Sequence, residues 1–237
     1  MRDAPPVVPK RVLSVFENLL PPGVVVVEAF GDIPGEGIFP GEEDLIANAA
    51  NSRRCEFVTA RRCAREALAT LGYAPAPIRV GPKREPLWQP GVVGSITHTT
   101  GFRAAAAALK TVCASVGIDA EQNVPLPDGV EEYITVAEER EMLAALAWAA
   151  PGIQWARLLF CAKEAVYKAW YPLTGRWLDF TDARLTIDPT GTFAAKLSID
   201  GHRADSAPAL NQLRGRFLIA DDLIASAVTV TRDVLYR

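Results

Sequence analysis

Apolar residues recur along this chain with two spacings, one typical of strands and one typical of helices. A β-branched run at residues 24–30 predicts a strand, and helical spacing over residues 42–71, ending before Gly72, predicts a long helix. Three short apolar runs at 92–98, 102–110 and 113–121 then predict adjacent strands of one sheet. The middle run is rich in alanine, so a helix remains an alternative there.

The second part of the chain repeats this order of elements. Helices are predicted at 136–149 and from 153 to about 171, where Pro172 is expected to end the helix. Strands are predicted at 183–187, 193–200, 216–220 and 223–231. The pattern therefore predicts an α+β fold built from two similar α/β halves, residues 1–118 and 119–237.

Composition narrows the class of protein. The chain has 237 residues, 49% hydrophobic and 22% charged, which is enough for one large or two small domains. A net charge of -3 argues against a general nucleic-acid partner, and no apolar run is long enough to cross a membrane. The first ten residues hold no apolar core of a signal peptide, and the four cysteines form no CxxC pair. We therefore expect a cytoplasmic protein with reduced cysteines.

Acidic residues end one predicted strand and interrupt one apolar helix. Asp119 and Glu121 are two apart on the strand and so leave the same face of the sheet, although a solvated strand end would explain them too. Glu164 and Lys168 are four apart on the helix, and a surface ion pair is the alternative for them. Because the rest of that helix is apolar, we favour chemistry: three acids and a lysine suit a Mg²⁺-assisted phosphoryl transfer.

Basic residues gather in the first half. Arg53, Arg61 and Arg65 lie near one face of the first long helix and suit phosphate, unless that face is simply solvated. His98 ends a predicted strand and is either a phosphate donor or a structural histidine. The Pro- and Gly-rich segment 74–94 is predicted to be loop and carries Lys83. The chain has no GxGxxG or P-loop motif, and GSITH at 94–98 is not the elbow of a serine hydrolase.

Four motifs in this order resemble one enzyme family. They are R-x₂-EF-x₃-R at 53–61, GSITH at 94–98, GIDAE at 117–121 and W-x₇-KEA-x₂-K at 155–168. The set resembles the 4'-phosphopantetheinyl transferases of the Sfp-like class, and most closely the actinobacterial branch that serves polyketide, fatty-acid and siderophore synthases. The resemblance covers about residues 50–180 and extends more loosely to the closing strands.

This resemblance implies a reaction, a fold and a set of partners. Coenzyme A would give its 4'-phosphopantetheine arm to a serine of an apo acyl, peptidyl or aryl carrier protein, leaving adenosine 3',5'-bisphosphate. The short class of the superfamily completes its site between subunits, whereas this chain is long enough to hold both halves. A monomer is therefore expected, with its halves related by a pseudo-two-fold axis and the active site in the cleft between them.

The resemblance also implies a role for individual residues. Glu164 would be the base, and Lys168 would stabilise or protonate the leaving phosphate. Mg²⁺ would be held by Asp119, Glu121, Glu164 and the carbonyl of Ala120. Ala120 stands between the two strand acids, so the helix must supply the third acid. Residues expected to bind coenzyme A are Arg53, Arg61 and His98 at the 3'-phosphate, Gly81, Lys83 and Arg84 in the loop, and Thr97, Asp119, Lys163, Lys168 and Trp177. Tyr167 and Trp177 would wall the pantetheine channel, although core packing would explain an aromatic residue there equally well.

Two other classes of function fit parts of this pattern. A different Mg²⁺-dependent phosphotransferase would act on a free nucleotide and need no carrier protein. A non-catalytic module would bind coenzyme A or a carrier protein and would not depend on Glu164 or Lys168. The acids and lysines of the motifs are all present, which favours an enzyme over a non-catalytic module.

Overall fold

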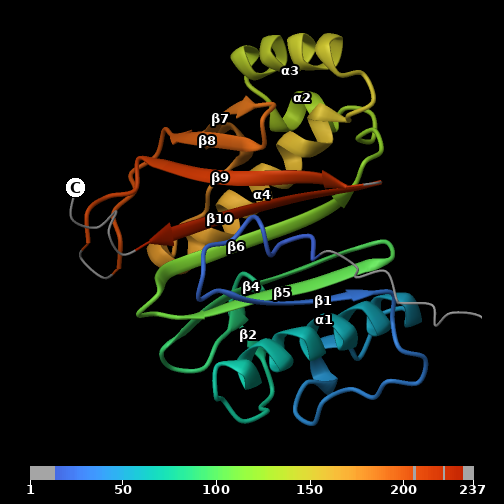
Figure 1. Ribbon diagram of the computed structural model, residues 1–237. Coiled ribbons are helices and arrows are strands. Elements are labelled where there is room, and N and C mark those ends of the chain that lie inside the picture. The colour runs from blue at the N-terminus through green and yellow to red at the C-terminus, as the bar shows by residue number, and fades with distance from the viewer. Residues whose placement is uncertain (1–13, 205–206, 221, 232–237) are drawn as a thin grey trace, which may run out of the picture.

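A computed structural model describes residues 14–204, 207–220 and 222–231 (Figure 1). The first ten residues, which we interpreted as lacking a signal peptide, lie outside this range. No helix within the described ranges has the length and apolar character needed to cross a bilayer.

A three-stranded antiparallel sheet forms the core of the first half. Its order is β1 (Val25–Phe30), β5 (Phe102–Leu109), β4 (Val92–Thr99), and helix α1 (Asn51–Thr70) covers one face (Figure 1). The alanine-rich run is therefore a strand. Its alanines are buried on both faces of the sheet, in two separate core clusters. Packing in the folded chain thus overrides the helical preference of alanine.

The helix predicted over 42–71 begins later than expected. A short 3₁₀ helix, η1 (Glu43–Ile46), precedes α1, which starts at Asn51. The reason is a long-range contact: the buried Glu42 carboxylate accepts hydrogen bonds from Ile78 N and from Arg65, which fixes this segment as a separate turn. The predicted end is confirmed, because Gly72 has a φ of +87° and Tyr73 N donates to Leu68 O at 3.0 Å.

The segment predicted as loop contains a small hairpin. Strands β2 (Arg79–Val80) and β3 (Pro86–Leu87) pair antiparallel, and residues 81–85 form the turn between them. The turn is tight, since Arg84 N donates to Gly81 O at 3.0 Å and Arg84 has a positive φ of 66°. Lys83 therefore lies at a defined hairpin tip rather than on an irregular loop.

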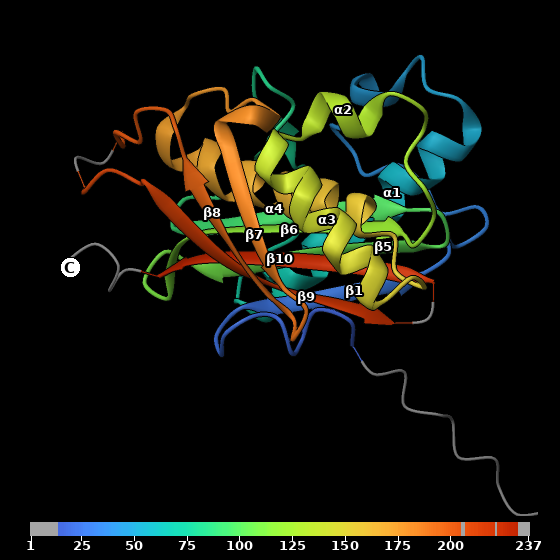
Figure 2. The same ribbon diagram turned by 90° about the horizontal axis from the view of Figure 1, so that it is seen from above.

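The second half holds a five-stranded antiparallel sheet and most of the helices. Its order is β6 (Cys113–Gln122), β10 (Leu223–Thr231), β9 (Gln212–Ala220), β8 (Thr192–Leu197), β7 (Ala183–Asp188). Helix α4 (Trp155–Thr174) packs on one face, beside the outer helix α3 (Ala137–Ala149) (Figure 2). Two short helices that the sequence did not predict are α2 (Val130–Ile134) and η2 (Phe180–Asp182).

Helix α4 passes the proline that was expected to end it. It continues to Thr174 and ends at Gly175, whose φ is +65° and whose amide donates to Tyr171 O at 2.8 Å. Pro172 lies in the last turn, where it removes the one hydrogen bond that an amide at this position would give to the Lys168 carbonyl.

Side chains join the two sheets where β4 lies beside β6. Ile118 N donates to Ser95 Oγ at 3.0 Å, and Ala120 N donates to Thr97 Oγ1 at 3.0 Å. Residues 95 and 97 thus meet residues 118 and 120 in the same order, as in strands that run parallel, but hydroxyls replace backbone partners. This junction, the β4–β6 seam, is where Ser95 and Thr97 of the GSITH motif act.

The α+β prediction is confirmed, with one long helix packed on an antiparallel sheet in each half. The predicted division between residues 118 and 119 falls inside β6, which pairs with β10 from Cys113 onward. The two-fold relation between the halves stays a prediction.

Candidate active site

A glycine sets the distance between α4 and β6. A Cβ atom at Gly117 would come within 2.1 Å of Ala165 O and 2.6 Å of Ala169 N, so any side chain there would push the helix away. The close approach brings the polar residues of α4 to the end of β6 that carries Asp119 and Glu121. The first residue of the GIDAE motif therefore has a packing role.

Lys168 bonds Asp119 rather than the Glu164 of its own helix. Its Nζ donates to Asp119 Oδ1 at 2.7 Å and to the carbonyls of Ile96 and Ile118 at 3.3 and 3.2 Å. Its ammonium thus bridges the two strands of the β4–β6 seam. Burial lowers the pKa of Lys168, but the charge and hydrogen bond of Asp119, together with smaller contributions that include the charge of Glu164, hold this pKa above its ordinary value.

The remaining acids lie close enough to repel one another. Burial, followed by the charge of Asp119, raises the pKa of Glu121 to about 7, although Arg157 lies 3.3 Å from its Oε2. Burial also raises the pKa of Glu164; Lys168 opposes that shift and Asp119 adds to it. The positive charges near these three carboxyl groups are therefore too few to balance the negative charge of all three carboxylates.

The acid cluster suits a hard cation. Asp119 is 6% exposed; Oδ1 accepts from Lys168 and Thr97, whereas Oδ2 is buried with no hydrogen-bond partner among the described residues. Within those residues, no three acidic, histidine or cysteine side chains already surround a metal-sized position. Oxygen ligands of this kind are nevertheless those that Mg²⁺ prefers, and an added cation would relieve the repulsion.

Lys163, the neighbour of Glu164, faces the protein interior. It is 2% exposed, and its Nζ donates to Glu139 Oε2, Ile134 O and Phe180 O at 2.7–2.8 Å. These acceptors match the three N–H groups of an ammonium. In this arrangement Lys163 ties α4 to α2, α3 and η2.

A basic cluster joins α1 to the end of β4. An Arg53 terminal nitrogen lies within hydrogen-bonding distance of the His98 ring and 3.3 Å from Glu56 Oε2. Burial, followed by the positive charge of Arg53, lowers the pKa of His98 to about 4. His98 is therefore neutral at pH 7 and has two ring nitrogens beside a guanidinium. The structure thus brings Arg53 and His98 together, as the sequence predicted for a phosphate contact.

Arg61 lies two turns further along α1 and is buried. Its guanidinium stacks on the Phe57 ring at 3.7 Å, and its Nε donates to Ile78 O at 3.3 Å. Burial lowers the pKa of Arg61 to about 10, while the charge of Glu42 opposes that shift. Arg65, the third arginine of the predicted stripe, bonds Glu42 and stacks on Phe39.

The hairpin tip of the first half reaches the second half. Lys83 Nζ lies 5.4 Å from the centre of the Trp177 ring, a cation–π contact. The two residues line a cavity of about 220 Å³. Predicted residues from both halves line it: Lys83, Lys163, Glu164, Tyr167 and Trp177. The other lining residues, which the sequence did not single out, are Leu178, Asp179, Phe180 and Ala183.

Aromatic rings and one hydroxyl characterise this cavity. Tyr167 packs edge-on against Trp177 with ring centres 5.2 Å apart. The Tyr167 hydroxyl is buried and has no hydrogen-bond partner among the described residues, and burial raises its pKa to about 12. Trp177 is 60% exposed and stands at the opening. The cavity suits a narrow apolar ligand that carries a hydrogen-bonding group.

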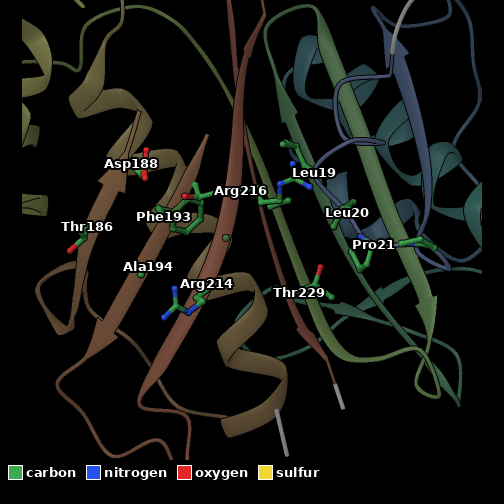
Figure 3. A pocket seen from close by; sticks show the side chains of 14 residues that line it. Leu19, Leu20, Pro21, Thr186, Asp188, Phe193, Ala194, Arg214, Arg216 and Thr229 are labelled. Carbon is green, nitrogen blue, oxygen red and sulfur yellow. The ribbon is translucent and has the colours of Figure 1, made fainter. Parts of the chain in front are cut away.

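A separate groove of about 650 Å³ lies on the other face of the second sheet, away from α4 (Figure 3). Arg214 and Arg216 of β9 lie along it, facing Leu19 and Pro21 across the groove. No predicted site residue lines it.

Sequence reasoning missed the carboxylates that hold the basic residues. Glu56 lies beside Arg53 and His98, and Glu42 lies beside Arg61 and Arg65. Glu56 stands inside the R-x₂-EF-x₃-R motif, so the motif itself pointed to it. Glu42 lies in another element, and nothing in its spacing connected it with Arg61.

Comparisons with known proteins identify the family. A model of the 4'-phosphopantetheinyl transferase N-terminal domain matches residues 41–108, and a model of the 4'-phosphopantetheinyl transferase superfamily matches residues 115–221. The chain belongs to the 4'-phosphopantetheinyl transferases. The first match ends in β5 and the second begins in β6, so the family spans both halves.

Three curated relatives of this family match most of the chain. 4'-Phosphopantetheinyl transferase Svp of Streptomyces mobaraensis is 47% identical over 216 residues, 90% of this chain and 87% of Svp. PptT of Mycobacterium tuberculosis is 44% identical over 222 residues, 92% of this chain and 94% of PptT. Npt of Nocardia iowensis is 43% identical over 222 residues, 90% of this chain and 99% of Npt.

These matches decide between the classes of function left open by the sequence. The chain is an enzyme of the phosphopantetheinyl transferase type, which moves the 4'-phosphopantetheine group of coenzyme A to a carrier protein. The resemblance to the actinobacterial branch is confirmed as well, and neither a free-nucleotide phosphotransferase nor a non-catalytic module is supported.

Proposed function

We propose that this 4'-phosphopantetheinyl transferase works with Mg²⁺, held by Asp119, Glu121 and Glu164 with the carbonyl of Ala120. The observation that carries the proposal is the buried, unpartnered Oδ2 of Asp119 beside two carboxyl groups whose pKa values are raised. When bound, Mg²⁺ supplies charge neutralisation at a pyrophosphate. Every other step is assigned to side chains of this chain.

Glu164 is the proposed base. The Oγ of the carrier serine attacks the phosphorus that bears the pantetheine arm, and the proton of that hydroxyl passes to Glu164. The bond from this phosphorus to the bridging oxygen breaks, and adenosine 3',5'-bisphosphate leaves. The position of Glu164 supports this role, because it lines the cavity proposed for the pantetheine arm.

Lys168 has two proposed tasks. Its charge stabilises the leaving phosphate, and its hydrogen bond at 2.7 Å orients Asp119. Because its other contacts are carbonyls of β4 and β6, Lys168 is held in place before substrate arrives. Thr97 supports the same carboxylate, since its hydroxyl donates to Asp119 Oδ1 at 3.1 Å.

Coenzyme A is proposed to lie across both halves. Arg53, Arg61 and His98 bind its 3'-phosphate, and the hairpin turn with Gly81, Lys83 and Arg84 borders the adenine and phosphates. The pantetheine arm enters the cavity between Tyr167 and Trp177, where the unpartnered Tyr167 hydroxyl suits an amide of the arm. Lys163 is proposed to belong to this site as a lining residue of the cavity, with its ammonium paired to Glu139.

The proposed partners are apo acyl, peptidyl and aryl carrier proteins. A monomer is supported because one chain supplies both the basic cluster and the acid cluster. A reducing cytoplasm is supported by the four cysteines, which are all free thiols.

Intact-mass spectrometry tests this function. An apo carrier protein is incubated with the enzyme, coenzyme A and Mg²⁺, and a parallel reaction contains EDTA. We expect a mass gain of one phosphopantetheinyl group that EDTA abolishes. An equal gain with EDTA would refute the role of the metal, and no gain with several unrelated carriers would refute the proposed partners.

A further inference from the structure

Glu42 is among the most deeply buried charged residues of the first half. It is 1% exposed and precedes η1. Its Oε1 accepts from Arg65 Nη1 at 2.9 Å and from Ile78 N at 2.7 Å, and its Oε2 lies 3.8 Å from Arg61 Nε. A buried carboxylate is costly unless it is paired, so these contacts constitute a built environment for one negative charge.

The charges around Glu42 leave a positive excess. Two guanidinium groups, of Arg61 and Arg65, face a single carboxylate. Arg65 gives a terminal nitrogen to Glu42. Among the described residues, the polar contacts of Arg61 all run through Nε, which leaves its two terminal nitrogens for a ligand. One positive charge thus remains on the arginine that the Phe57 ring holds in place.

We propose that Glu42 is a positioning residue for the 3'-phosphate of coenzyme A. It acts through Arg61, by holding the guanidinium in the orientation in which its terminal nitrogens meet phosphate. This inference rests on the proposed contact of Arg61 with the 3'-phosphate. Glu42, which is far from Arg61 in sequence, would preorganise the contact between Arg61 and the 3'-phosphate.

Glu42 also joins the elements that must keep their relative positions for this contact. Its carboxylate binds α1 through Arg65 and the residue before β2 through Ile78 N, while Arg61 Nε donates to Ile78 O. Both the amide and the carbonyl of Ile78 therefore serve the Glu42–Arg61 contact. Without the carboxylate, Arg61 and Arg65 would repel each other.

The test compares two substrates in the Glu42→Gln variant. The glutamine keeps the shape and an acceptor for Ile78 N but loses the negative charge. We expect kcat/KM for coenzyme A to fall about tenfold, and kcat/KM for 3'-dephospho-coenzyme A to fall less than about twofold, with kcat unchanged. The change should therefore lie in the KM for coenzyme A.

A matched control is available on the same turn. Asp44 forms an exposed bidentate pair with Arg79, at 2.7 and 2.8 Å, without contacting Arg61. Asp44→Asn should loosen the turn and leave the preference between the two substrates as in the wild type. If it lowered the preference equally, an effect through turn stability would replace the positioning role.

Two results for the Glu42→Gln variant itself would also overturn the inference. In the first, Glu42→Gln weakens both substrates equally, so Glu42 has only a structural role. In the second, Glu42→Gln leaves both unchanged while Arg61→Ala still discriminates between them. Should Arg61→Ala itself fail to discriminate, the proposed phosphate contact would fall and the inference with it; transfer by the wild type is measured separately by mass spectrometry.

Discussion

The basic cluster of the first half and the acid cluster of the second half solve opposite electrostatic problems in different ways. In the first, Arg53, Arg61 and Arg65 each lie within 4 Å of a carboxylate, and aromatic rings hold two of them. In the second, the buried Oδ2 of Asp119 has no partner in the described structure, and two neighbouring carboxyl groups have raised pKa values. Each arginine of the basic cluster has a carboxylate neighbour although a positive excess remains, whereas the acid cluster keeps a carboxylate oxygen without a partner in the described structure.

This difference separates binding from chemistry. A site whose donors are fixed before the ligand arrives loses little on binding and gives selectivity. A site of crowded acids gains stability when a further cation joins it, because that cation relieves the repulsion among the carboxylates. We therefore expect changes in the acid cluster to act mainly on turnover and metal response, and changes in the basic cluster to act mainly on substrate affinity.

The largest expected effect comes from Glu164→Gln. Loss of a general base costs about 10²- to 10⁴-fold, so transfer should fall by at least about 100-fold. Coenzyme A affinity should stay within about tenfold, because the basic cluster is untouched. Carrier mass and calorimetric binding measure the two quantities. Glu138→Gln is the control, because Glu138 of α3 is exposed and pairs with Arg184 of β7. Retained turnover in Glu164→Gln would exclude Glu164 as the base.

Arg61→Ala should produce the next largest effect, on affinity rather than turnover. Loss of a charged hydrogen bond costs about 1.5–3 kcal/mol, so coenzyme A should bind about 10- to 100-fold more weakly. Binding of 3'-dephospho-coenzyme A should hardly change. Arg62→Ala, next in sequence but paired with Glu36 and Glu66, is the control. Equal weakening of both ligands by Arg61→Ala would contradict a 3'-phosphate contact.

Glu121→Gln should stabilise the metal-free enzyme. It removes one of the crowded carboxylates, and a gain of about 1 kcal/mol would raise Tm by about 2–4 °C in a chain of this size. Mg²⁺ should raise the Tm of the wild type and raise that of the variant less. Differential scanning calorimetry with and without Mg²⁺ measures both, and a lower Tm for the metal-free variant would refute the proposed repulsion.

The last expected effect is the response of stability to acid at His98, which leaves activity at pH 7 untouched. Its folded-state pKa of about 4 lies below the ordinary 6.5, so at pH 5 the unfolded chain binds a proton that the folded chain does not. Stability is therefore lost as pH falls from about 6.5 toward 4. His98→Gln should lose less Tm between pH 7 and pH 5 than the wild type. His202→Gln, at an exposed position, should behave like the wild type, and identical losses in all three proteins would count against the pKa of His98.

Local patterns predicted the elements better than their limits. Alternation and turn residues located the strands, and Gly72 marked the end of α1, because these are short-range properties. The start of α1 depended on the contact of Glu42 with Ile78, which no local pattern contains. Pro172 was misleading because the helix continues past it for two residues despite the loss of one amide donor.

Motif spacing predicted which residues would gather better than which atoms would meet. Glu164 and Lys168 share a helix face, yet Lys168 bonds Asp119, because Gly117 lets α4 approach β6. The charge of Lys163 is buried against Glu139, a partner 24 residues earlier that helical spacing does not connect with it. Contacts between elements thus decide the roles of side chains that look alike in the sequence.

At the β4–β6 seam, Lys168 has a structural role as well as its proposed role in the reaction. Lys168 donates to carbonyls of both strands and to Asp119, and we propose that the same ammonium takes part in the reaction. We expect a chain without this ammonium to lose contact between its halves as well as transfer, so stability and activity should fall together. A folded but inactive form of the enzyme is therefore hard to reach by a single substitution at Lys168.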